Sequence, residues 1–333
     1  MLLTIVLLAG SGALLFLAWL ARSMAERREA RRDPPGEWVQ VDGKRIHVRR
    51  AGSGGPTIVF EAGGAFSSAM WWPLQDRLAG LATVACYDRA GLGWSEPADL
   101  PRTIEQRADE LGKVLQAAQL PAPYVLVGLS YGGPLIRVFA ARHPELVAGL
   151  VFVDAAHEAA FASPGAQTYL KRSAGMLRFI AALASVGVPR LLRMRGTSQP
   201  ATALPFTDAQ RAALESRFPP AASFRTGADE FTSMLRIAEV TRGLDARGSL
   251  GTRPVCVLSH GMPFPGPFAV LEHNHMRGQQ ELAALSERGE VVVAEHSSHA
   301  IPLQEPGLVL EAVQRVWRAA STSLNTAGSE PRP

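Results

Sequence analysis

Residues 124–139 constrain the fold more than any other stretch, because two apolar runs flank a glycine-rich turn that holds one serine. The first run, Tyr124–Val127, predicts a buried strand, and the second, from Leu135, predicts a helix. The turn between them reads Gly128-Leu129-Ser130-Tyr131-Gly132. Such a turn forces the serine into strained backbone angles, and its glycines allow strand and helix to approach closely. We predict that Ser130 is an exposed nucleophile; the alternative is a glycine-rich turn with an incidental serine.

Strand and helix patterns alternate on both sides of this turn. The predicted strands are 37–41, 45–50, 57–61, 82–87, 124–127, 150–154, 253–258 and 290–295, and the predicted helices are 69–78, 102–120, 276–288 and 306–319. This alternation predicts an α/β fold with a mostly parallel sheet and helices on both faces, formed by residues 37–154 and 253–320. In such a sheet, functional residues belong at the carboxyl ends of the strands.

The alternation stops between residues 155 and 252, a stretch without a strand signal. Helices are expected near 167–184, 207–217 and 228–242. A run of this length without regular structure is uncommon in a compact domain, so we expect a helical lid that covers Ser130. The polar tail, residues 321–333, is expected to be disordered.

The N-terminal stretch differs from the rest because residues 1–20 contain no charged side chain. About 20 apolar residues in a helix span a bilayer, so residues 1–21 are predicted to be an uncleaved membrane anchor. The linker that follows, residues 22–36, carries an excess of arginine: Arg22, Arg27, Arg28, Arg31 and Arg32. Arginine on this flank predicts a cytoplasmic catalytic domain.

Composition excludes several other classes of protein. The formal net charge is +4, but the basic residues are scattered among acidic ones, so no nucleic-acid partner is expected. The two cysteines, Cys86 and Cys256, lie in apolar runs and are expected to be buried thiols. They cannot form a disulfide framework or a cysteine-based metal site.

Two further segments give the chain a resemblance to a known family. Residues 87–95 read YDRAGLGWS, and Ser298-His299-Ala300-Ile301 is followed by Pro306. With the serine turn, these segments resemble the α/β-hydrolase fold family, in particular its serine esterases and lipases with a helical lid. The resemblance covers residues 37–320. It places Ser130 where the dehalogenase and epoxide-hydrolase branches carry an aspartate, which implies acyl transfer.

A serine hydroxyl needs a base within hydrogen-bond reach, and histidine is the usual one near neutral pH. We predict that His299 is this base, because it follows the last predicted strand and matches the family's histidine loop; His296 is the rival. The other histidines match no motif and are expected at surface or loop positions: His47, His143, His157, His260, His273 and His275.

The third member of the expected triad is a carboxylate that orients the histidine. Most relatives place it after the strand that here ends at Leu258, yet no aspartate occurs beyond Asp245. Asp154, at the end of the preceding predicted strand, is the position used by other branches of the fold. It also preserves the chain order serine, acid, histidine. We predict Asp154 as the acid, with Glu272 as the alternative.

The oxyanion of a tetrahedral intermediate needs two backbone N–H donors. The residue after the nucleophile, Tyr131, supplies one of them. The resemblance assigns the second to Gly64, in the sequence Glu61-Ala62-Gly63-Gly64-Ala65, where Ala62 replaces the histidine that relatives usually carry. An ordinary turn is the alternative interpretation of these glycines.

Together these observations predict a membrane-anchored serine hydrolase that cleaves a lipophilic carboxylic ester through an acyl-enzyme, without a metal or cofactor. A peptidase or amidase and a cofactor-free carbon–carbon bond hydrolase could use the same triad. A non-catalytic ligand-binding protein on the same scaffold is the alternative from a different class. The sequence leaves the oligomeric state open.

Overall fold

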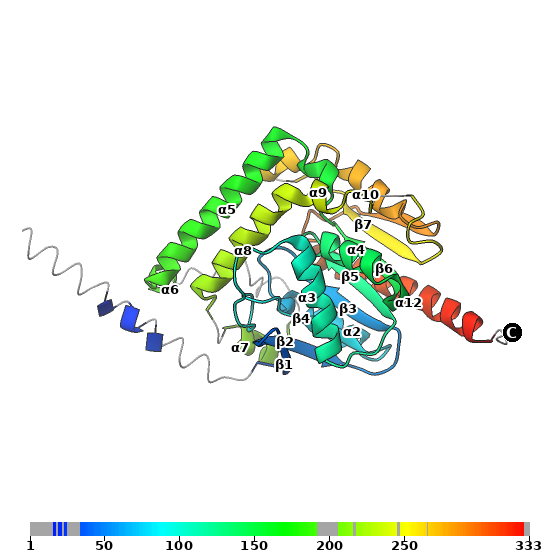
Figure 1. The fold of residues 1–333 in the computed structure, drawn as a ribbon, viewed down its shortest axis with the longest axis horizontal. Coiled ribbons are helices and arrows are strands. Elements are labelled where there is room, and N and C mark those ends of the chain that lie inside the picture. The colour runs from blue at the N-terminus through cyan, green and yellow to red at the C-terminus, as the bar shows by residue number, and fades with distance from the viewer. Residues whose placement is uncertain are drawn as a thin grey trace, which may run out of the picture.

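The computed structural model describes residues 16–17, 19–21, 23–24, 34–191, 206–215, 218–244, 247–264 and 266–329 (Figure 1). The anchor predicted over 1–21 and the linker predicted over 22–36 lie largely outside these residues. Within the described part of the chain, none of the helices combines the length and the apolar character that crossing a bilayer requires.

The molecule is built on one sheet of eight strands in the order β1-β2-β4-β3-β5-β6-β7-β8. The strands are β1 (Glu37–Val41), β2 (Lys44–Ala51), β3 (Thr57–Glu61), β4 (Val84–Tyr87), β5 (Tyr124–Leu129), β6 (Val147–Val153), β7 (Val255–His260) and β8 (Gly289–Ala294). β2 pairs antiparallel with β1 and β4, and all other pairs are parallel. The predicted mostly parallel sheet is confirmed.

The turn between β1 and β2 shows how local sequence determines the first hairpin of the sheet. Asp42 and Gly43 have φ values of 49° and 74°, the left-handed region that a two-residue hairpin turn requires. The centre of the sheet is buried on both faces, because every residue of β3, β4 and β5 is buried. Strands buried on both faces need helices on both faces.

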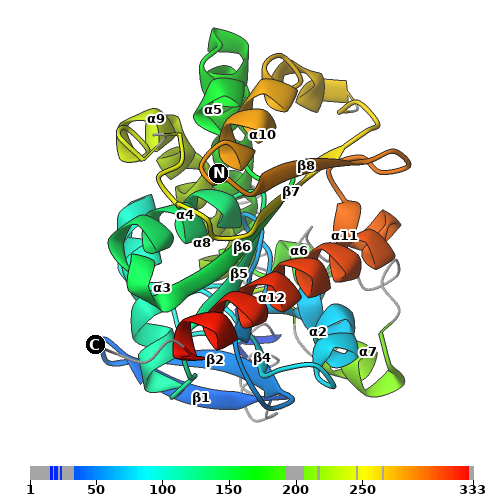
Figure 2. The ribbon, with the colours of Figure 1, turned by 90° about the vertical axis from the view of Figure 1, so that its right-hand side faces the viewer.

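Helices cover the sheet on its two faces (Figure 2). One face packs against α2 (Trp72–Leu78) and α12 (Pro306–Ser329), in a core that includes Leu78 and Val313. The other face packs against α3 (Ile104–Ala117), α4 (Gly132–Arg142) and α10 (His275–Ala283), in a core that includes Leu111. The cysteines Cys86 and Cys256 are buried free thiols, as predicted.

The described residues between β6 and β7 form helices and connecting segments. The α-helices are α5 (Pro164–Ser185), α6 (Val188–Leu191), α7 (Asp208–Glu215), α8 (Ala221–Ser233) and α9 (Ile237–Val240), and α11 (Ile301–Gln304) precedes α12. Short 3-10 helices occur at Ser68–Trp71, Pro144–Leu146, Glu158–Phe161, Met234–Arg236 and Gly266–Leu271. Figure 1 shows α5 and α8 side by side, and the two helices pack against each other.

Most predicted boundaries differ from the structure by a few residues, and two differ by more. The single helix predicted over 228–242 is instead α8, which begins at Ala221, followed by a 3-10 turn and α9. The tail predicted to be disordered from residue 321 continues α12 as far as Ser329. Sequence patterns fix the ends of elements less well than their existence, since caps and tertiary contacts decide where a helix stops.

Candidate active site

Ser130 lies in the turn between β5 and α4 with a φ of 50°, a left-handed angle that is rare for a residue with a side chain. The neighbouring glycines make this turn possible. A Cβ on Gly128 would lie 2.7 Å from the Gly132 carbonyl oxygen, and a Cβ on Gly132 would lie 2.7 Å from that of Glu61. The glycines therefore allow the close approach that the sequence pattern predicts, and Ser130 is held in a strained turn.

A second strained turn lies directly beside the first. Asp154 follows β6 with a φ of 44°. The Ser130 N–H donates to the Val153 carbonyl at 3.1 Å, and the Ala156 N–H donates to the Ser130 carbonyl at 2.9 Å. Because β5 and β6 are parallel neighbours, their carboxyl ends meet, and these hydrogen bonds fix the serine turn against the aspartate turn.

The structure brings His299 to this same edge of the sheet. His299 Nδ1 lies 2.5 Å from Asp154 Oδ2, and the histidine side chain is 40% exposed while the aspartate is fully buried. A carboxylate in this position orients the ring and stabilises its protonated form. No hydrogen bond joins Ser130 to His299 among the described residues. In enzymes without substrate, this contact is often long and tightens only in the complex.

Two histidines that sequence reasoning placed at the surface or in loops are buried around the same carboxylate. His260 Nδ1 lies 2.8 Å from Asp154 Oδ1, and its backbone N–H donates to the same oxygen at 3.0 Å. His275 Nε2 lies 3.0 Å from Asp154 Oδ1, and its ring stacks on that of His260. The expectation was wrong for these residues. These histidines are buried because the Asp154 carboxylate is buried, and its lone pairs require several hydrogen-bond donors.

The same expectation fails for His47 and His157, which are also buried. His47 Nδ1 lies 2.9 Å from Asp88 Oδ2, and Asp88 also accepts hydrogen bonds from the Ser68 and Trp94 N–H groups. Asp88 belongs to the segment of family resemblance, residues 87–95. The sequence therefore already indicated that Asp88 would be buried and would need a partner.

The histidines around Asp154 determine its electrostatics. Burial alone would raise the pKa of Asp154, but hydrogen bonds from His260, His275 and His299 hold that pKa well below its ordinary value. Burial likewise works to lower the pKa of His260, yet the hydrogen bond and charge of Asp154, with Glu272, raise it. Asp154 is therefore ionised at neutral pH, as an orienting carboxylate must be.

Glu272, the alternative acid, has different partners. Its Oε2 lies 3.3 Å from His260 Nε2 and accepts a hydrogen bond from the Phe264 N–H at 3.1 Å. The described contacts of Glu272 do not include His299. Of the two candidate acids, the geometry favours Asp154.

Asp154, His260 and His275 also have the chemistry of metal ligands, and their ligand atoms lie within 4.8 Å of one another. Each of these atoms already has a hydrogen-bond partner inside the cluster. Hydrogen bonding to an ionised carboxylate is sufficient to explain why these groups are buried together.

The two residues expected to supply the oxyanion donors lie close together. A Cβ on Gly64 would lie 3.4 Å from Tyr131 Cβ. Within the described chain, neither the Gly64 N–H nor the Tyr131 N–H has a hydrogen-bond acceptor. Gly64 is half-buried and Tyr131 is buried, and a pair of N–H groups without acceptors beside a strained serine is suited to a developing negative charge. Burial raises the pKa of the Tyr131 phenol to about 12, so this side chain stays neutral.

Sequence reasoning missed the buried charges around residues 61–65, the oxyanion loop that contains Gly64. Arg89 pairs with Glu61 and Glu230, and all of these side chains are at most 1% exposed. The signal for Arg89 was its place beside Asp88 in the segment of family resemblance. Glu230 lies on α8, in a part of the sequence that offered no comparable motif.

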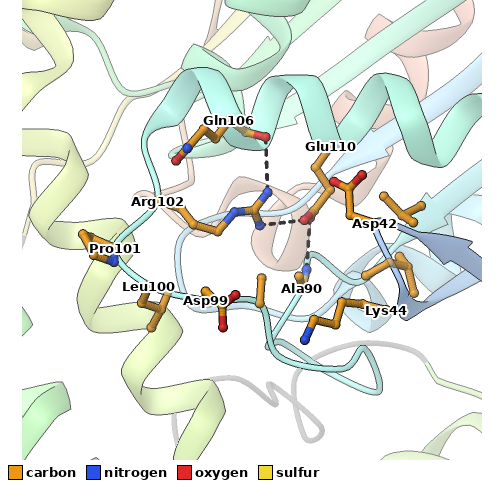
Figure 3. A pocket seen from close by; sticks show the side chains of 12 residues that line it. Asp42, Lys44, Ala90, Asp99, Leu100, Pro101, Arg102, Gln106 and Glu110 are labelled. Carbon is orange, nitrogen blue, oxygen red and sulfur yellow. Dashed lines mark hydrogen bonds and ion pairs between the residues drawn. The ribbon is translucent and has the colours of Figure 1, made fainter.

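A surface pocket of about 290 Å³ lies elsewhere, between the β1–β2 hairpin and the start of α3 (Figure 3). Arg102 crosses it to Glu110, with 2.6 Å between Nη1 and Oε2, and Glu110 accepts a hydrogen bond from the Ala90 N–H. None of the candidate triad or oxyanion residues lines this pocket. It is separate from the site around Ser130.

Comparisons with known proteins agree with this fold. The family described as alpha/beta hydrolase fold matches residues 56–218. The chain therefore has the α/β-hydrolase fold. Uncharacterized protein YqjL of Bacillus subtilis (strain 168) is 38% identical over 117 residues, which cover 35% of this chain and 46% of that protein. The match thus spans less than half the length of this relative.

Solved structures extend the likeness to most of the chain. A thermophilic esterase from Thermogutta terrifontis covers 85% of this chain and 98% of its own, at a TM-score of 0.60 and 21% identity. Epoxide hydrolase CorEH covers 86% and 99%, at a TM-score of 0.65 and 22% identity. At these identities the likeness shows the fold, and different reactions occur on that fold.

Proposed function

We propose that this chain is a serine hydrolase that cleaves a carboxylic ester through an acyl-enzyme, with Ser130 as nucleophile, His299 as base and Asp154 as the orienting acid. The observation that carries the proposal is the contact of 2.5 Å between His299 Nδ1 and a buried Asp154, beside a serine with a φ of 50°. A strained serine next to an oriented histidine is the arrangement that acyl transfer needs.

In the proposed mechanism, Ser130 Oγ attacks the ester carbonyl carbon while His299 Nε2 accepts the hydroxyl proton. The oxyanion accepts hydrogen bonds from the Gly64 and Tyr131 N–H groups. Collapse of the intermediate breaks the bond to the alcohol oxygen, which leaves with the proton from His299. A water then attacks the acyl carbon, with His299 as base, and releases the carboxylic acid and Ser130.

The residue type at position 130 supports acyl transfer over the other reactions found among the structural neighbours. Those neighbours include an epoxide hydrolase and a haloalkane dehalogenase, and the resemblance gives such branches an aspartate at this position. A serine ester can be hydrolysed at its carbonyl by water, which makes serine suited to ester cleavage.

We also propose that the protein associates with a membrane through its N-terminal segment, with the catalytic domain in the cytoplasm. The uncharged residues 1–20 support an anchor. On the folded domain, Met176 and Phe179 of α5 are 59% and 61% exposed, and the helix carries Lys171 and Arg172 but no acidic residue. An apolar face flanked by basic groups suits an anionic bilayer surface and a lipophilic ester.

The membrane proposal is tested with the full chain. A reporter fused after Pro333 should give a cytoplasmic signal, and a signal from the other side of the membrane would contradict the orientation. Replacing Phe179 by Ser should weaken binding of the domain surface to vesicles of anionic lipid, measured by a polarity-sensitive dye at position 182.

The catalytic proposal is tested by labelling the full chain with a fluorophosphonate, which reacts with an activated serine. Ser130→Ala and His299→Ala should lose labelling, whereas Glu272→Gln should keep it. Ser286→Ala is a matched control for a buried serine, because the Ser286 hydroxyl donates to the Arg253 carbonyl and not to the proposed triad. Labelling that survives in Ser130→Ala would contradict the assignment of the nucleophile. A folded wild type that is not labelled would favour the non-catalytic scaffold.

A further inference from the structure

The peptide group between Gly63 and Gly64 is held by a buried arginine. Arg89 Nη2 donates to the Gly63 carbonyl at 2.8 Å, and Nη1 donates to the Ala62 carbonyl at 2.8 Å and to Glu61 Oε1. A trans peptide is planar, so the direction of the Gly63 C=O fixes the opposite direction of the Gly64 N–H. Arg89 therefore orients the backbone donor that the proposed mechanism assigns to the oxyanion.

The other side of Gly64 is held from α8. Glu230 Oε2 accepts a hydrogen bond from the Ala65 N–H at 2.7 Å, and Glu230 Oε1 accepts one from Arg89 Nε at 2.8 Å. Ala65 has a φ of 62°, a strained angle for a residue with a side chain, which persists only where its surroundings hold it. Glu230 thus bridges the arginine and the strained residue, and Gly64 lies between two fixed points.

α8 reaches this loop so closely that only a small residue fits. A Cβ on Gly227 would lie 2.7 Å from Ala65 Cβ. The same helix contacts the second donor residue, because Ser233 Oγ lies 2.9 Å from the Tyr131 hydroxyl and donates to the Glu230 carbonyl. One helix from the segment between β6 and β7 therefore contacts Tyr131, which would supply one oxyanion donor, and Ala65, the residue after Gly64.

We propose that α8 sets the oxyanion donors through Glu230 and Arg89, which act as positioning residues for the Gly64 N–H. The helix over the site would thus be a part of the catalytic geometry and not only a cover. The proposal rests on the serine-hydrolase function proposed above. Displacement of α8 would release Ala65 and the Gly63 carbonyl together, so catalysis requires that α8 is seated.

The test compares Glu230→Gln and Arg89→Lys with Asp229→Asn in the full chain. Asp229 is the matched control: it lies next to Glu230 on α8 and forms a buried pair with Arg107, at 2.6 Å, but its described contacts do not include the oxyanion loop. With p-nitrophenyl butyrate as substrate, Glu230→Gln and Arg89→Lys should lower kcat by about tenfold or more with little change in KM, since the donor acts mainly in the transition state. Asp229→Asn should retain kcat.

An equal loss of kcat in all three variants, or a change in KM alone, would overturn the proposal. A second measurement compares the affinities of the enzyme for two inhibitors, a trifluoromethyl ketone and its methyl ketone counterpart. If Glu230 had only a structural role, Glu230→Gln would lower the amount of folded enzyme but would leave the ratio of these affinities unchanged. The positioning role predicts that Glu230→Gln lowers this affinity ratio, because only the fluorinated adduct carries an oxyanion. An unchanged ratio would contradict it.

Hydrogen exchange of the wild-type chain provides a measurement that needs neither activity nor a folded variant. If α8 holds the loop, the amide of Ala65 should exchange in the same opening event, and with the same denaturant dependence, as the amides of α8. Exchange of Ala65 while α8 stays protected would overturn the coupling. A different outcome is a folded chain that the fluorophosphonate does not label, while Ala65 and α8 still exchange together. That result would refute the proposed function and leave the coupling between α8 and Ala65 intact.

Discussion

The two sides of the candidate site hold their buried groups with different chemistry. On the oxyanion side, Arg89 is paired with the buried Glu61 and Glu230. Burial works to lower the pKa of Arg89, but the charges of Glu230 and Glu61 raise it well above its ordinary value. On the acid side, Asp154 is surrounded by the rings of His260, His275 and His299. The comparison teaches that Arg89 should keep its charge near neutral pH, while the side that contains His260 should respond to pH.

The largest expected effect lies on the acid side. Asp154→Asn keeps the shape of the side chain but removes the charge that orients His299 and stabilises its protonated form. We expect kcat for an ester to fall about 10⁴-fold, as when a triad aspartate is replaced in this way. Ester kinetics at neutral pH measure it, with Glu272→Gln as the control. Equal losses in both variants would show that Asp154 is not the specific acid.

On the oxyanion side, Arg89→Met should have the largest effect on folding. It leaves Glu61 and Glu230 buried without their partner, and breaking a buried ion pair in this way costs about 3–5 kcal/mol. Urea unfolding at pH 7 measures the loss. Arg45→Met, which breaks an exposed pair with Glu96, is the control and should cost less than about 1 kcal/mol. Similar costs for both would remove the contrast between the buried and the exposed pair.

The free energy of unfolding, measured at several pH values, distinguishes the acid side from the oxyanion side. The pKa of His260 is raised in the folded state, against burial, chiefly by Asp154 and then by Glu272. A raised pKa contributes stability that is fully present below the unfolded pKa of about 6.5 and is lost as the pH rises through the folded value. The difference in free energy of unfolding between wild type and His260→Gln should therefore shrink from pH 6 to pH 9. A constant difference would contradict this assignment.

The smallest effects concern two glycines of the oxyanion side. A Cβ on Gly132 would lie 2.7 Å from the Glu61 carbonyl oxygen and 3.0 Å from that of Ala62, so Gly132→Ala should destabilise the fold by about 1–3 kcal/mol. A Cβ on Gly64 meets Tyr131 Cβ at 3.4 Å, an ordinary contact, so Gly64→Ala should stay within about 0.5 kcal/mol. Thermal unfolding measures the loss of stability in both variants. A larger loss for Gly64→Ala than for Gly132→Ala would contradict the expected order.

Much of this architecture could be predicted from local patterns. The strand predicted over 57–61 is β3 without a change of boundary, and the serine turn has the strained φ that its glycines imply. Alternating burial and turn residues are local properties, so a sequence displays them directly. The position of Asp154 beside His299 also follows, because the parallel strands that precede them, β6 and β8, end at the same edge of the sheet.

The partners of buried charges could not be predicted in this way. Glu230 and Arg89 are 141 residues apart in the chain, and nothing in the sequence near either residue points to the other. His260 and His275 look like loop histidines until the fold places both of them beside Asp154. Side chains that satisfy a buried group come from whichever elements the fold brings close.

The sequence by itself determined the strands, the serine turn and the chemistry available at the sheet edge, because propensity, periodicity and glycine placement act over a few residues. Only the tertiary structure decided which histidines surround Asp154 and that α8 reaches the oxyanion loop. Those outcomes depend on long-range packing, where the cost of burying a charge selects partners by distance in space and not by distance along the chain.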